Sequence, residues 1–124
     1  MTAFERLAKA RGEVALALAR RLGVTISLSH RGAPPVTLFA RVLEQSLLRL
    51  DQGSIVAEVR TITFELAVQD GFPRAQQGLE PITVGDAIVY RERTHAVSGP
   101  VRKDRGGWIY TVLAVEHKRL ASGG

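Results

Sequence analysis

Residues 84–115 constrain the fold of this chain more than any other stretch, because they read as three short strands joined by two turns. Gly85 and Asp86 supply a tight turn, after which Ile88 and Tyr90 alternate with polar neighbours. The pair Gly106-Gly107 provides the positive-φ backbone that a second turn needs before a final apolar strand. This pattern predicts antiparallel strands in a closed β module rather than an enzyme pocket.

The length of 124 residues is typical of one domain and too short for two full cores. Because 45% of the residues are hydrophobic but only 6% are aromatic, the core must consist mainly of Val, Leu, Ile and Ala. The chain contains no cysteine, which excludes disulfides and thiolate metal sites and fits a reducing compartment.

The first 22 residues are predicted to form an amphipathic helix. Thr2 is the expected N-cap, Glu5 completes a capping box with it, and Gly23 is the expected C-terminal glycine. Charged side chains interrupt this segment, so it is neither a signal peptide nor a membrane span, and we expect a soluble protein made in the cytosol. The apolar residues that share one helical stripe are Phe4, Leu7, Ala8, Ala15, Leu18 and Leu22.

At Gly23 the hydrophobic period changes from 3.6 to 2, which indicates strands. We expect strands over residues 24–28, 36–43, 54–60 and 62–68, whereas residues 44–50 suit either a helical turn or a short strand. The sequence therefore predicts a mainly β fold with one N-terminal α-helix, built as a small antiparallel β-barrel or a strongly twisted sheet. Within this single domain, residues 1–22 are the helix, 23–117 the barrel and 118–124 a flexible tail.

Charge is unevenly distributed along the chain, whose formal net charge is +5. Residues 1–21 and 91–105 each hold five basic and two acidic groups, whereas residues 22–90 hold five basic and seven acidic. Such asymmetry favours nucleic acid or an acidic protein face as a partner. Ordinary solvated surface charge is an equally weighted alternative.

The candidate partner interface combines these basic groups with the long connection over residues 69–81, since connections of this length often bind partners. Its basic side chains have three possible roles: solvated turn, protein interface or direct contact with DNA. For Trp108, an anchor in the core or a subunit interface is favoured over a base-stacking platform, because no other aromatic residues are interleaved nearby. The candidate residues are Phe72, Arg74, Arg91, Arg93, Arg102, Lys103, Arg105 and Trp108.

Catalytic chemistry is not indicated by the sequence. The histidines His30, His95 and His117 are far apart and form no metal-ligand spacing, so we expect surface or structural roles for them. Asp86 and Asp104 lie at turns, where a carboxylate usually caps backbone N–H groups. Nucleophile-elbow, phosphate-loop and dinucleotide motifs are all absent from the sequence. We therefore expect no enzyme, no cofactor and no metal.

The order of elements in the second half resembles the tail-attachment proteins of long-tailed bacteriophages, also described as head–tail joining, head-closure or neck proteins. The resemblance rests on the run ITFELAVQD, a loop containing proline, the run VGDAIVY, the strand around HAVS and the run DRGGWIYTVL. It covers roughly residues 54–115 in pattern, and the whole chain in size and element order.

This resemblance implies a structural protein that forms a homo-oligomeric ring at the neck of a virion, assembled in the cytoplasm of a bacterial host. The implied partners are further copies of the chain, the portal or its adaptor, the tail tube or terminator, and the packaged DNA, with no membrane. A ring needs complementary, non-identical surfaces on each subunit, and an acidic middle with basic ends is compatible with that. The alternatives are a nucleic-acid-binding β-barrel of the oligonucleotide-binding kind and another tail component such as a terminator.

Overall fold

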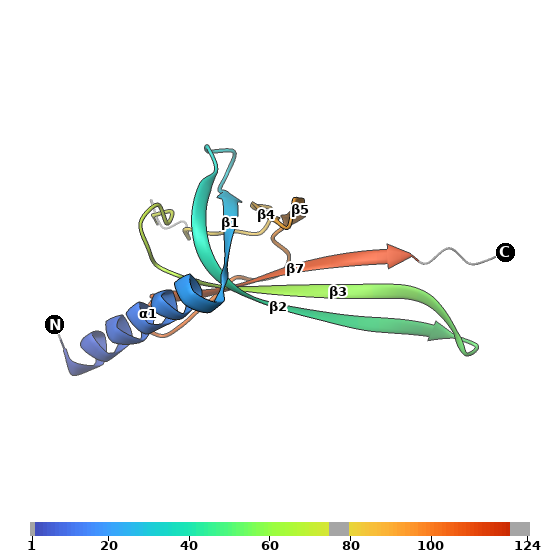
Figure 1. Cartoon of the computed structure of the whole chain (residues 1–124), viewed down its shortest axis with the longest axis horizontal. Coiled ribbons are helices and arrows are strands. Elements are labelled where there is room, and N and C mark those ends of the chain that lie inside the picture. Colours follow the sequence, from blue (N-terminus) through green and yellow to red (C-terminus); the bar gives the residue numbers. More distant parts are fainter. Residues whose placement is uncertain (1, 75–79, 120–124) are drawn as a thin grey trace.

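The computed structural model describes residues 2–74 and 80–119 (Figure 1). The loop residues 75–79, part of the predicted partner loop, and residues 120–124 of the predicted tail lie outside this described part. The elements are α1 (Ala3–Leu22), β1 (Val24–Ser29), β2 (Val36–Asp51), β3 (Ser54–Ala67), β4 (Ala87–Tyr90), β5 (Arg93–Ala96), β6 (Arg102–Lys103) and β7 (Ile109–Arg119).

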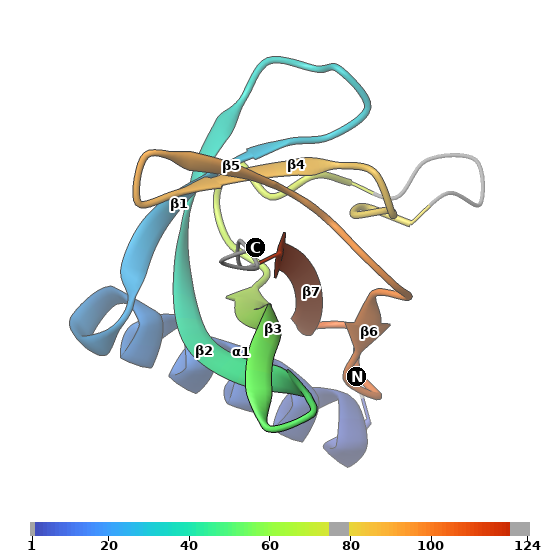
Figure 2. The same cartoon turned by 90° about the vertical axis from the view of Figure 1, so that its right-hand side faces the viewer.

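The seven strands form one sheet in the order β5-β4-β1-β2-β3-β7-β6, and all neighbouring strands are antiparallel. Figure 2 shows how strongly this sheet curls, with β4 and β5 on one side of the curl and β6 and β7 on the other. The fold is a half-barrel preceded by one helix, which confirms the predicted fold class. The segment predicted to hold three strands holds four, because the two-residue β6 follows Pro100.

The core lies inside the curl and is supplied by alternate residues of the strands. Ile62, Phe64 and Leu66 are fully buried, as the period-2 run predicts. Phe64 meets the ring of Tyr90 edge to face at 5.6 Å, which joins β3 to β4 across the interior. Near the core, β1, β2, β3, β4 and β7 thus point alternate residues into the curl and the others outward.

Helix α1 begins as predicted, because Thr2 and Glu5 form the reciprocal capping box. Its packing differs from what an amphipathic stripe implies. The buried residues of α1 are small, whereas Phe4, Leu7 and Leu22 are exposed. The cause is the close approach of the sheet: a Cβ at Gly12 would lie only 2.7 Å from the Cβ of Trp108. The small buried face consists of Ala8, Gly12, Ala15 and Ala19.

Gly23 ends the helix as predicted, and its φ of −94° lies outside the left-handed region. Its N–H donates to the Ala19 carbonyl at 2.9 Å. A side chain is excluded there because a Cβ would lie 2.2 Å from the Ala40 carbonyl oxygen. The glycine is therefore required by close packing between the helix end and β2.

The ambiguous segment over residues 44–50 is a strand, and it continues β2 without interruption from Val36 to Asp51. Strands β2 and β3 form a long hairpin whose tip turn uses positive φ at Gln52 (50°) and Gly53 (81°). Figure 1 shows this hairpin projecting from the body on the side opposite α1. Strand β7 follows it through Arg119, two residues beyond the predicted end of the barrel.

Candidate partner interface

The projecting hairpin carries large apolar side chains that face solvent. Leu47 is 71% exposed and Leu50 61% exposed, and Leu43, Leu48 and Ile55 are also exposed. Because side chains alternate along a strand, Leu47 and Leu48 point to opposite faces of the hairpin. Both faces of the tip are thus apolar, which soluble monomers rarely tolerate without a partner.

The edge of β2 is also open along this projection. Pairing with β1 ends at Ala40, which is opposite Val24. At Phe39, the backbone N–H donates to Gln69 Oε1 at 2.8 Å, and Gln69 Nε2 donates to the Phe39 carbonyl at 3.0 Å. The side chain of Gln69 therefore provides the hydrogen bonds on the β3 side of Phe39, where pairing between the β2 and β3 backbones has ended. Beyond Ala40, β2 is paired on one side only within the described residues.

The predicted basic group is divided by the structure into two clusters. Arg91 and Arg93 belong to the β4–β5 hairpin, whereas Arg102, Lys103 and Arg105 lie on or beside β6, on the other side of the curl (Figure 2). The sequence placed all five on turns of one final sheet, but the curl separates these turns. One continuous basic surface is therefore not formed by these residues.

Within each cluster, some cations already have partners in the chain. Arg91 pairs with Glu44 at 3.3 Å and lies 5.2 Å above the ring of Tyr90. Lys103 pairs with Glu80 at 3.2 Å. The guanidinium of Arg105 lies 5.3 Å from the ring centre of Phe4 on α1. These three side chains therefore help to hold elements of the same chain together.

The remaining candidate cations are exposed, and none forms an ion pair within the described residues. They are Arg74, Arg93 and Arg102. Exposed cations without a partner are the groups best able to meet an acidic surface or a phosphate.

The two aromatic candidates serve packing. Phe72 is buried, and its ring centre lies 5.2 Å from that of Tyr110, so its side chain anchors the loop after β3 to the core. Trp108 is half-buried and packs beneath Gly12 of α1. Its backbone N–H donates to Asp104 Oδ1 at 2.8 Å, which confirms Asp104 as a turn cap.

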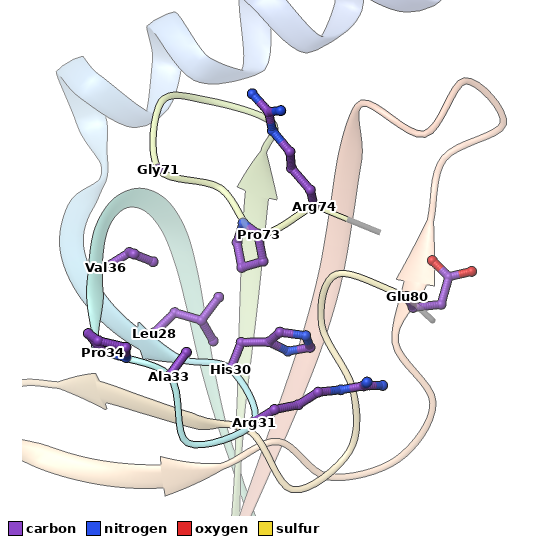
Figure 3. Close-up of a pocket in the computed structure, with 10 residues that line it drawn as sticks. All are labelled: Leu28, His30, Arg31, Ala33, Pro34, Val36, Gly71, Pro73, Arg74 and Glu80. Carbon is purple, nitrogen blue, oxygen red and sulfur yellow. The ribbon is translucent and has the colours of Figure 1, made fainter. Parts of the chain in front are cut away.

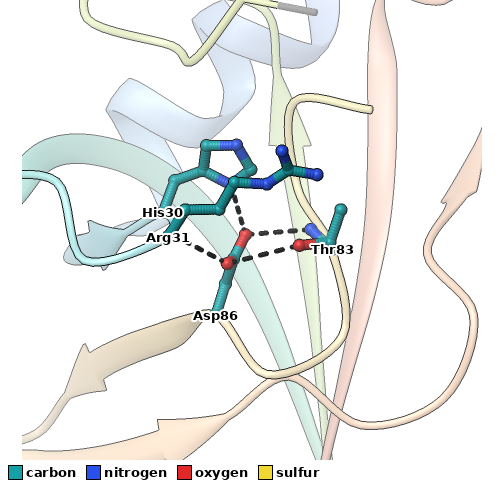
Figure 4. A network of polar contacts seen from close by, with 4 residues as sticks. All are labelled: His30, Arg31, Thr83 and Asp86. Atoms are coloured by element: carbon teal, nitrogen blue, oxygen red, sulfur yellow. Dashed lines mark hydrogen bonds and ion pairs between the residues drawn. The ribbon is translucent and has the colours of Figure 1, made fainter. Parts of the chain in front are cut away.

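A network that sequence reasoning did not find is centred on Asp86 (Figure 4). The Nδ1 of His30 lies 2.5 Å from Asp86 Oδ2, and the backbone N–H of Arg31 donates to Oδ1 at 3.2 Å. The N–H of Thr83 donates to Oδ2 at 2.9 Å. The Gly-Asp motif predicted the turn beside β4, but the partner from the β1–β2 loop is 56 residues away in sequence. Only folding brings the two loops together.

This network favours the ionised form of the Asp86 side chain over the protonated form. Burial by itself would raise the pKa of Asp86, but the hydrogen bonds from His30, Thr83 and Arg31 outweigh that effect and lower it. Asp86 is therefore ionised at neutral pH and joins two loops at the packed end of the sheet.

His30 also borders an open cavity of about 410 Å³ between the β1–β2 loop and the loop after β3 (Figure 3). Its ring lies next to the Arg31 side chain, whereas Arg74 points away from both. The Nδ1 of His30 is occupied by Asp86, and no hydroxyl or thiol side chain is found among the described residues that line the cavity. His30 therefore belongs to the junction between the two loops.

Among the described residues, no three His, Asp or Glu side chains gather in a way that could hold a metal ion. The same part of the chain has no helix with the length and apolar character needed to cross a membrane. His95 is buried against Phe64, with its Nδ1 3.1 Å from a Glu116 oxygen, while the side chain of His117 lies outside the described part.

No protein-family model matches this sequence, and no curated protein matches it.

Proposed function

We propose that this chain is a structural protein of the head–tail junction of a long-tailed bacteriophage or prophage. In this role, copies of the chain form a ring between the portal or its adaptor and the tail. The observation that carries the proposal is the projecting β2–β3 hairpin, whose exposed leucines have no role in the fold of one chain. Exposed apolar patches of this kind commonly mark a surface that another protein covers.

The rest of the molecule is consistent with assembly rather than turnover. The Asp86 network joins loops, and Phe72 and Tyr110 pack against each other. Among the described residues that line the His30 cavity, none carries a hydroxyl or a thiol. The element order, with a helix followed by a curled antiparallel sheet, is also that of the head–tail joining proteins the sequence resembles.

Deletion of the gene for this chain from the phage or prophage genome tests the proposed function. We expect particles with DNA-filled heads and no attached tails, seen by negative-stain electron microscopy, and a loss of infectious particles. Complementation with the normal chain restores tails, whereas the Leu47→Asp variant fails because its charge prevents burial of the hairpin. Val84→Asp is the matched control, since Val84 is also largely exposed, at 60%, but lies outside the hairpin. Infectious, tailed particles from the deletion strain would overturn the proposal.

The exposed cations favour one second candidate, a β module that binds nucleic acid. Arg74, Arg93 and Arg102 are free of ion pairs within the described residues, and such groups bind phosphates with a strong dependence on salt. Fluorescence polarisation of labelled single-stranded DNA against salt concentration separates the two. Tight binding whose affinity falls steeply with salt, and is lost in the triple Arg→Glu variant, supports this candidate.

A further inference from the structure

Two apolar surfaces are left uncovered in this chain, and they lie at its opposite ends (Figure 1). The first is the hairpin tip, formed by Leu47, Leu48, Leu50 and Ile55. The second is the outer stripe of α1, where Leu7 is 52% and Val14 is 59% exposed. The helix has buried its small residues against its own sheet, so its larger apolar side chains remain outside.

The helix stripe borders a groove that can receive side chains. A groove of about 340 Å³ lies along α1, lined by the apolar side chains of Leu7, Val14 and Leu18. Two charged residues, Arg11 of α1 and Glu65 of β3, also line it. Apolar side chains of a partner that insert into this groove would be removed from water, and no contact within the fold would have to break.

The two surfaces are of similar length and lie on segments of opposite net charge. Leu48 and Leu50 share one face of β2 and are two strand residues apart, or roughly 7 Å, with Ile55 paired to Leu50 beside them; Leu7 and Val14 are seven helical residues apart, or roughly 10 Å. Residues 3–22 hold five basic and two acidic groups, whereas residues 44–60 hold two basic and three acidic. Opposite net charge steers the two elements toward each other.

We propose that the hairpin tip of one copy docks along the α1 stripe of the next copy, in a head-to-tail contact. This inference rests on the proposed ring and specifies the contact between its subunits. The tip cannot reach the helix of its own chain, because the two project in opposite directions. A contact between two different surfaces repeats from copy to copy, and it closes into a ring when the rotation between copies allows it.

The contact is small, and this determines how it must be measured. A patch about 10 Å long against a helix about 10 Å wide buries far less than the roughly 800 Å² per partner of a stable complex. Isolated subunits should therefore associate weakly and only at high concentration. Trapping the contact by cross-linking is more informative than measuring a mass.

The natural absence of cysteine allows a clean experiment. Val14→Cys and Leu50→Cys are prepared as separate full-length proteins, mixed, and treated with a short bifunctional maleimide at rising protein concentration. We expect a cross-linked dimer in the mixture that is at least tenfold more abundant than in either protein alone. As a matched control, Val84→Cys replaces Leu50→Cys, since Val84 is 60% exposed but lies outside both the hairpin and α1; it should give no dimer above background.

Three other results would overturn the inference. A dimer from Leu50→Cys alone means that two hairpins pair with each other, and a dimer from Val14→Cys alone means that two helices do. No dimer at any attainable concentration, in variants whose circular dichroism matches the parent chain, means that the two surfaces do not meet.

The cross-link and the deletion experiment can fail separately. If the mixed dimer forms but deletion leaves tailed particles, the chain assembles head to tail in another structure. If deletion removes tails but the mixed dimer is absent, the head–tail role stands and its ring uses other surfaces.

Discussion

The two ends of the β2–β3 hairpin consist of the same strands and similar residues, yet they differ in what covers them. At the base, Phe64 and Leu38 are buried in the core cluster, to which β1, β4 and β7 also contribute side chains. At the tip, Leu47 and Leu50 face solvent. On β2 the change occurs where β1 stops pairing with it at Ala40. Hydrophobic character therefore does not decide burial here; the presence of neighbouring strands does.

This difference indicates that the base and the tip of the hairpin have separate roles. The base contributes to the free energy of unfolding of the subunit, while the tip contributes little to it and remains available for another chain. Changes at the base should alter folding, and changes at the tip should alter association alone.

The largest effect is expected at Phe64. Phe64→Ala leaves a cavity in a fully buried site and should lower the free energy of unfolding by about 3–5 kcal/mol. Leu47→Ala at the tip should change it by no more than about 0.5 kcal/mol. Urea denaturation followed by circular dichroism measures both. A comparable loss in the two variants would show that the tip is packed in solution and would remove the contrast.

The next effect concerns the loops at the packed end. Asp86→Asn weakens the contact with His30 and should cost about 1–3 kcal/mol at pH 7. The folded state lowers the pKa of Asp86, so its stabilisation is complete above the ordinary Asp pKa and is lost as pH falls through the folded value. The difference between the variant and the parent should therefore narrow below about pH 4. Asp51→Asn at the tip is the control, and a constant difference across pH would contradict the assignment.

Helix packing on the base gives a test in which two effects oppose each other. Gly12→Ala improves helix propensity by about 1 kcal/mol, but its Cβ would lie 2.7 Å from the Trp108 Cβ. We expect a net loss of about 1–2 kcal/mol from this overpacking. In a Trp108→Gly background the same change should become neutral or stabilising, as thermal denaturation of the four proteins would show. Equal effects in both backgrounds would mean that α1 is not docked as described.

The smallest effect is expected at the tip turn, where Gln52 and Gly53 both have positive φ. Asn-Gly is the preferred pair for such a turn, so Gln52→Asn should slow amide exchange at the tip while changing global stability by at most about 0.5 kcal/mol. Gln69→Asn is the matched substitution at the base. It shortens the side chain that bonds to Phe39 and should cost about 1 kcal/mol. A larger global effect at Gln52 than at Gln69 would reverse the comparison.

Much of the fold was predictable from local patterns. The capping box at Thr2 and Glu5, the alternation of Ile62, Phe64 and Leu66, and the turn at Gly85-Asp86 each depend on residues close together in the sequence. Such interactions are encoded by spacing, and the structure confirms them together with the half-barrel class. Residues 44–50 were ambiguous because two leucines in a row fit either period.

The candidate interface was less predictable. The sequence grouped five basic residues, but the curl separates Arg91 and Arg93 from the three near β6. It also selected Phe72, which the structure places in the core. The exposed tip escaped notice because Leu47 and Leu50 look like core residues in a linear pattern.

The sequence by itself determined the element types, the helix start, the turn chemistry and the absence of cysteine, because these depend on residue identity and short-range geometry. Tertiary structure alone decided which apolar residues are covered, which face of α1 is buried and which loops Asp86 joins. Those outcomes depend on where distant strands begin and end. Burial is a property of neighbours in space, and spacing along the chain does not specify them.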